Sequence, residues 1–136
     1  MSRGIREDVR AFFEGVPAAV AVYIFGSAAR GSSTPESDLD IAVLFDATPA
    51  STLMGPRLTL EGGLEQALGR TVDLVVLNTA PADLVHRVLR DGDLVLERDK
   101  PRRIRFEVAR RNEYFDLQPL RDRYRRARQP SSARVR

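Results

Sequence analysis

Two carboxylates separated by a single residue, Asp38 and Asp40, open one of the apolar runs of this sequence. If that run is a β-strand, the alternation of side chains places both on the same face, roughly 7 Å apart. Two acids held side by side repel each other and favour a bound cation, and Mg²⁺ prefers carboxylate and phosphate oxygens. Ten residues before this pair, Gly26 and Ser27 close the preceding apolar run.

Asp73 interrupts a third apolar run, residues 71–77. If the second and third strands are neighbours in a sheet, Asp73 lies about 5 Å from the face that carries Asp38 and Asp40. Three carboxylates would then converge and supply oxygen ligands for one or two Mg²⁺ ions. Asp73 would complete the second metal site and could take the proton of an acceptor.

The Gly-Ser turn is suited to binding the phosphates of a nucleoside triphosphate. Gly26 would let the backbone approach the phosphates closely, and Ser27 would donate its hydroxyl and N–H groups to the β- and γ-phosphates. Arg30 either contacts a phosphate or ties the turn to an acid such as Glu36. A phosphate-binding turn beside three metal-binding acids indicates phosphoryl or nucleotidyl transfer.

Other chemistries find little support in the sequence. It contains no cysteine, which excludes a disulfide framework, a thiolate zinc site and a cysteine nucleophile. The single histidine, His86, lies on a predicted helix next to its apolar stripe, where a packing or surface role is the better interpretation. We interpret Tyr23, Tyr114 and Tyr124 as packing residues.

The periodicity of apolar residues predicts alternating helices and strands and therefore an α/β (α+β) fold, with a mixed sheet of about four strands backed by helices. A short helix is expected at residues 27–31, and a loop at 46–56 precedes a weak helix that Gly69 ends. In the last long helix, Ile104, Val108 and Phe115 share one stripe. The predicted strands are residues 18–25, 38–45, 71–77 and 93–97, and the predicted main helices lie before residue 15, before Gly69, between residues 81 and 92, and from about residue 101.

Length and charge place further limits. The 136 residues suit one domain, residues 1–128, followed by a disordered tail, residues 129–136. With no signal peptide and no membrane span in the sequence, we expect a soluble protein of the cytoplasm. Residues 1–97 carry 8 basic and 14 acidic side chains, whereas residues 98–136 carry 14 basic and 5 acidic ones. The Arg-rich segment 121–128 is a solvated terminus or an arm for an acidic partner, and nucleic-acid binding there is the less favoured interpretation.

The motif Gly-Ser, ten residues, Asp-x-Asp resembles the signature of the minimal nucleotidyltransferases of the DNA polymerase beta superfamily, matched by Gly26, Ser27, Asp38 and Asp40, with Asp73 as the third strand acid. Residues 18–124 are similar to the small antitoxin branch of that superfamily. The resemblance implies a polymerase-beta-like fold and a Mg²⁺-dependent enzyme that uses ATP.

Members of that branch pair with a HEPN-domain ribonuclease toxin, and the resemblance implies transfer of AMP to a toxin tyrosine within a hetero-oligomer. Two alternatives stay open. One is nucleotidyl transfer to a small molecule such as an aminoglycoside, although the chain leaves little length for the helical domain that such enzymes generally add. The other is a binding module that masks its partner by contact alone.

Overall fold

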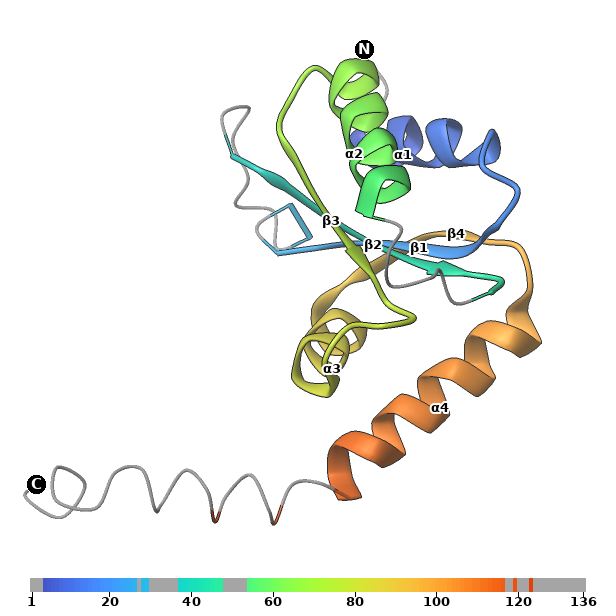
Figure 1. Ribbon diagram of the computed structural model, residues 1–136, viewed down its shortest axis with the longest axis vertical. Helices are drawn as coiled ribbons and strands as arrows, with labels where there is room; N and C mark the ends of the chain where they lie inside the picture. Colours follow the sequence, from blue (N-terminus) through green and yellow to red (C-terminus); the bar gives the residue numbers. More distant parts are fainter. Residues whose placement is uncertain are drawn as a thin grey trace, which may run out of the picture.

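A four-stranded sheet lies between two pairs of helices in the computed structural model of the chain (Figure 1). The structure describes residues 4–26, 28–29, 37–47, 54–116, 119 and 123. The strands are β1 (Ala19–Phe25), β2 (Leu39–Phe45), β3 (Val72–Val76) and β4 (Asp93–Glu97). The helices are α1 (Ile5–Glu14), α2 (Met54–Leu68), α3 (Ala82–Asp91) and α4 (Lys100–Asp116).

The strand order is β3-β2-β1-β4, and the sheet is mixed. β1 pairs antiparallel with both β2 and β4, whereas β2 and β3 are parallel. Because β1 and β2 run in opposite directions, the carboxyl end of β1 meets the amino ends of β2 and β3 at one end of the sheet. The predicted mixed sheet and the predicted neighbourhood of the second and third strands are confirmed.

Core side chains cover both faces of the sheet. β1 is buried along its whole length, as its uninterrupted apolar sequence predicts. On one face Ile24 packs with Phe13 of α1 and Leu64 of α2. On the other face Tyr23 and Phe25 pack with the apolar side of α3.

The two central strands are therefore held by helices from both sides, so the ends of these strands are fixed points on which a site can be built. The turn from α1 into β1 is tied down by Arg98, whose guanidinium group donates hydrogen bonds to four backbone carbonyls, those of Phe13, Glu14, Val16 and Ala19. Carbonyls at the end of a helix have no partner within the helix, and Arg98 supplies one.

Several element boundaries differ from prediction by a few residues. Ala18 and Asp38 precede their strands instead of opening them, and the predicted loop 46–56 gives way to α2 at Met54. Pro56 is accommodated because the N–H groups of a first helical turn need no partner inside the helix. Gly69 ends α2 as predicted, with a φ of +70°.

The predicted helix at residues 27–31 lies largely outside the described residues, of which Ala28 and Ala29 form a turn. The tail at 129–136 also lies outside them, and only Arg123 of the Arg-rich segment is described. Within the described part of the chain, no helix is long and apolar enough to cross a membrane.

Candidate functional site

The three predicted acids share one face of the sheet at the end where β2 and β3 begin. The parallel register pairs Asp40 directly with Asp73, so their Cα atoms occupy adjacent positions about 5 Å apart. Asp38 stands two residues before Asp40 and directly precedes β2, and continuing the alternation of the strand by one residue directs it to the same face. Ala42, further along that face of β2, packs in the core beneath α3. The acids therefore lie on the side of the sheet that α3 and α4 cover.

The acids differ in their exposure to solvent. Asp40 is half-buried, whereas Asp38 and Asp73 are exposed. One carboxylate is thus held within the fold while the other two face solvent, where a charged ligand can reach them.

Gly26 lies directly against Asp40. Its φ is +73°, a left-handed conformation that residues with a side chain rarely adopt. A Cβ atom at this position would collide with Oδ2 of Asp40. The antiparallel register pairs Phe25 with Asp40, which explains this close approach. Gly26 therefore serves the site through its missing side chain, by leaving room for the carboxylate.

Acidic side chains of α2 hold the strand that carries Asp73. β3 is an edge strand, so the N–H groups of Val72 and Leu74 point away from β2. Glu65 accepts a hydrogen bond from Val72 N at 2.9 Å, and Glu61 accepts one from Leu74 N at 2.8 Å. These bonds occupy the exposed edge on both sides of Asp73 and fix its position.

Two arginines complete this support. Arg57 of α2 donates a hydrogen bond to the carbonyl of Leu74 at 2.7 Å. Arg70 donates one to the carbonyl of Ser37 at 2.9 Å, which links the segment before β3 to the residue before Asp38. Sequence reasoning missed Glu61, Glu65, Arg57 and Arg70, because nothing in their spacing shows that they reach the backbone of another strand.

Two predicted site residues are not described by the structure, and the single histidine has a packing role. Ser27 and Arg30 lie outside the described residues. His86 stacks on Tyr114, with ring centroids 3.9 Å apart and planes inclined by 2°, so the packing role predicted for it is confirmed.

Carboxylate oxygens are the donors available for a cation at this end of the sheet. No three acidic or histidine side chains among the described residues are close enough to enclose a metal ion by themselves. Mg²⁺ in nucleotide enzymes is generally held by one or two carboxylates together with phosphate oxygens of the substrate and water. Paired carboxylates on Asp40 and Asp73 fit that mode of binding, in which the nucleotide brings part of the ligand set.

Comparison with known proteins points in one direction. The sequence model described as polymerase beta nucleotidyltransferase matches residues 7–101. The chain is 38% identical over 80 residues to the protein adenylyltransferase MntA of Shewanella oneidensis and 37% identical over 68 residues to MntA of Thermococcus cleftensis. These matches cover 58% and 50% of this chain and 55% and 66% of the two relatives, so the chain matches less than two thirds of either relative's length.

Solved structures extend the similarity over nearly the whole chain. A chain of a toxin–antitoxin crystal structure with AMP-PNP is 28% identical, with a TM-score of 0.77 and coverage of 89% of this chain and 95% of the other. A chain of the complex between a tri-AMPylated Shewanella oneidensis HEPN toxin and an MNT antitoxin is 27% identical, with a TM-score of 0.69 and coverage of 88% and 91%. The family model matches more than half of the sequence, and the fold agrees with it. The chain therefore belongs to the polymerase beta nucleotidyltransferase family.

Proposed function

We propose that this chain is an antitoxin that transfers AMP from ATP to a tyrosine hydroxyl of a HEPN-domain ribonuclease toxin and so inactivates it. The observation that carries the proposal is the pairing of Asp40 with Asp73, with Asp38 on the same face and Gly26 against Asp40. The names of the relatives support the acceptor, since both are protein adenylyltransferases and one similar structure contains a HEPN toxin that bears AMP groups.

In the proposed reaction, an acceptor oxygen forms a bond with the α-phosphorus of ATP, and the bond between that phosphorus and the bridging oxygen of the β-phosphate breaks. Pyrophosphate leaves, and the acceptor's proton passes to a carboxylate, for which Asp73 is our assignment because it is exposed on the site face. Asp38, Asp40 and Asp73 would hold Mg²⁺. When bound, Mg²⁺ lowers the negative charge that an attacking hydroxyl must approach.

The protein's own part is to position the substrates. Asp40 is held by the Gly26 turn, and Asp73 by the α2 contacts to its strand. Ser27 and Arg30 follow the turn directly and are proposed to contact the phosphates. Preorganised acids on neighbouring strands can fix the reacting groups in line, and misplacement of such groups by 1 Å can cost about 100-fold in rate.

The test is the intact mass of the product of the adjacent gene after incubation with the chain, Mg²⁺ and each nucleoside triphosphate separately. We expect a gain of one or more AMP units with ATP and none when EDTA replaces Mg²⁺. The double variant Asp38→Asn with Asp40→Asn should bind the toxin but transfer nothing, whereas Gln66→Ala, an exposed change on α2, should behave as wild type.

Two results would overturn the proposal. One is the absence of a nucleotide-sized mass gain with any nucleotide. The other is a double Asp→Asn variant that silences the toxin as fully as wild type, which would mean that contact alone masks the partner.

A further inference from the structure

Helix α4 carries three of its large apolar side chains on the side that faces solvent, whereas Phe106 packs against the core. Ile104, Val108 and Phe115 are 41%, 48% and 59% exposed. Their spacing places them along one stripe of the helix, here called the α4 stripe. Leu58 of α2, 52% exposed, is the one other large apolar side chain with comparable exposure in the described part of the chain. The amphipathic stripe predicted from the sequence therefore exists, but it does not face the core.

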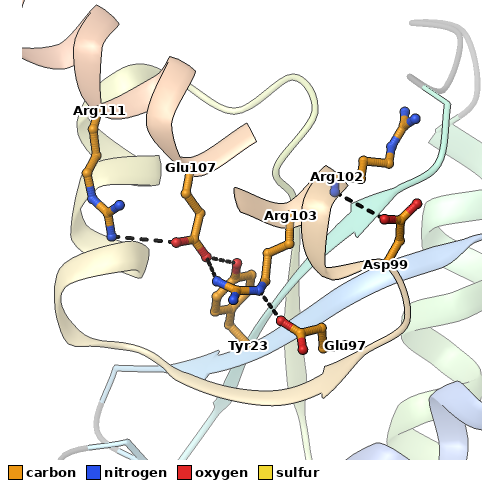
Figure 2. A network of polar contacts seen from close by, with 7 residues as sticks. All are labelled: Tyr23, Glu97, Asp99, Arg102, Arg103, Glu107 and Arg111. Atoms are coloured by element: carbon orange, nitrogen blue, oxygen red, sulfur yellow. Dashed lines mark hydrogen bonds and ion pairs between the residues drawn. The ribbon is translucent and has the colours of Figure 1, made fainter. Parts of the chain in front are cut away.

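The charged side of α4 faces the body of the protein instead. Glu107 is the one buried residue of this helix in the structure as described, and its carboxylate accepts a hydrogen bond from Tyr23 of β1 at 2.6 Å. The same carboxylate lies between Arg103 and Arg111 (Figure 2), at N–O distances of 2.7 Å and 3.6 Å, and Arg103 also pairs with Glu97. Turning the helix to bury the α4 stripe would break every one of these contacts.

Further contacts anchor α4 along its length. Asp99 accepts a hydrogen bond from Arg102 N at 3.1 Å at the start of the helix. Arg110 donates one to the carbonyl of Ala80, and Tyr114 stacks on His86 of α3. Contacts at both ends and in the middle of α4 thus fix the outward direction of the α4 stripe. Figure 1 shows α4 running obliquely below the sheet.

A basic hollow adjoins the α4 stripe. Its volume is about 350 Å³, and it lies near the carboxyl end of β2, roughly 13 Å along that strand from Asp40. Its lining residues are Leu44, Asn78, Arg102, Arg105, Phe106 and Arg110. Arg105 is exposed and stands on the helix between the hollow and the α4 stripe. An apolar ridge beside an arginine-lined hollow is complementary to an apolar surface with acidic side chains at its edge.

We propose that the α4 stripe and the basic hollow together dock the protein that receives the nucleotide, through an apolar surface of that protein bordered by carboxylates. This inference rests on the proposed function, which supplies a protein acceptor. The α4 stripe and the basic hollow lie on the same side of the sheet as the three acids. Tyr23, which bonds to Glu107 of α4, packs in the core cluster on the sheet face that carries Asp40. A partner held there can present a hydroxyl group to the site.

The size and charge of this face favour such a partner over a second copy of the chain. α4 is about 25 Å long, so its outer face alone is on the order of 250 Å², well below the roughly 800 Å² that each partner buries in a stable complex. An interface built on the α4 stripe must therefore extend beyond it, and the hollow is surface that adjoins it. α4 carries six basic and three acidic side chains, and a second copy docked by the same face would bring two basic surfaces together.

The test is the affinity of the chain for the purified product of the adjacent gene, measured by isothermal titration calorimetry. We expect Ile104→Asp with Val108→Asp to weaken binding by about 100-fold or more, because it places charges in the centre of the interface. Arg105→Glu should weaken binding by at least about 10-fold and more strongly at low salt. Leu58→Asp is the matched control, an equally exposed side chain on the opposite face of the sheet, and should bind as wild type.

Circular dichroism melting of each variant separates loss of the face from loss of the fold. The proposal is overturned if the stripe variant binds as tightly as wild type while folded, if Leu58→Asp weakens binding equally, or if wild type self-associates through the stripe in sedimentation experiments. These outcomes leave AMP transfer untouched. Conversely, tight binding that the stripe variant abolishes, without any mass gain on the partner, supports docking and contradicts the enzymatic proposal.

Discussion

Gly26 stands so close to Asp40 that a Cβ atom added at Gly26 would lie far inside van der Waals contact with the carboxylate oxygen Oδ2 of Asp40. This relationship explains why a glycine ends β1. The positive φ of Gly26 and the direct pairing of Phe25 with Asp40 bring the turn and the acid together. The Gly-Ser element and the Asp-x-Asp element are therefore parts of one contact and depend on each other.

Comparison of Gly26→Ala with Gly69→Ala should separate two effects of Gly26, its positive φ and the room that it leaves for Asp40. Gly69 has a similar φ of +70°, but nothing within 4 Å of its added Cβ. Both Gly→Ala variants should lose about 1–2 kcal/mol of unfolding free energy through backbone strain. Only Gly26→Ala should also lose nucleotide transfer, by about 100-fold, because it displaces Asp40. Urea denaturation and the transfer rate are the measurements, and equal activity of the two variants would contradict this explanation.

The carboxylate of Glu61 should matter for the site although it lies on a helix, because it holds the backbone of β3. Glu61→Ala leaves Leu74 N without its acceptor and removes the ion pair to Arg57, and we expect a loss of about 1–3 kcal/mol in stability. Amide hydrogen exchange in β3 should become faster, and transfer should fall about 10-fold as Asp73 becomes less well held. Gln66→Ala, exposed on the same helix, is the control. Unchanged exchange at Leu74 in Glu61→Ala would refute the role.

Much of this architecture could be predicted from local sequence signals. The apolar run of β1, the alternation in β2 and the acid within β3 each act over a few residues, and together they were sufficient to place Asp38, Asp40 and Asp73 on one face. That prediction depended on β2 and β3 being neighbours, which the structure confirms. Pairing between residues 33 positions apart, such as Asp40 and Asp73, is a property of the packed sheet, so from the sequence it could only be assumed.

Contacts between distant side chains were not predictable in this way. Tyr23 and Glu107 are 84 residues apart, and neither has neighbours in the sequence that indicate the other. The stripe of Ile104, Val108 and Phe115 defines a face of α4 but not its direction, because periodicity is the same whether that face meets the core or a partner. The buried network at Glu107 decides the direction.

Removal of the Glu107 carboxylate should lower the free energy of unfolding far more than removal of a surface acid from the same helix. Glu107→Ala leaves the hydroxyl of buried Tyr23 and the guanidinium of Arg103 without their shared acceptor, and we expect a loss of about 3 kcal/mol in unfolding free energy. Glu113→Ala removes an ion pair to Arg110 whose acid is 50% exposed, and should change stability by about 0.5 kcal/mol or less. Urea denaturation measures both, and comparable losses would show that the network does not hold α4.

The same network should make stability depend on pH in the alkaline range. Burial, followed by the hydrogen bond to Glu107 and its negative charge, raises the pKa of Tyr23 above its ordinary value of 10.0. The folded protein therefore keeps a proton that the unfolded chain loses above that value. The stabilisation is fully present below pH 10 and declines as pH rises further, by up to about 1.4 kcal/mol per pH unit.

Tyr23→Phe removes this titration while Glu107 keeps its ion pairs to Arg103 and Arg111. The difference in unfolding free energy between wild type and Tyr23→Phe should be constant up to about pH 9 and should shrink by more than 1 kcal/mol by about pH 11. Contributions from all other groups are common to both proteins and cancel in the difference. Chemical denaturation at a series of pH values measures it. A difference that stays constant across this range would mean that the Tyr23 phenol ionises as readily in the folded protein as in the unfolded chain.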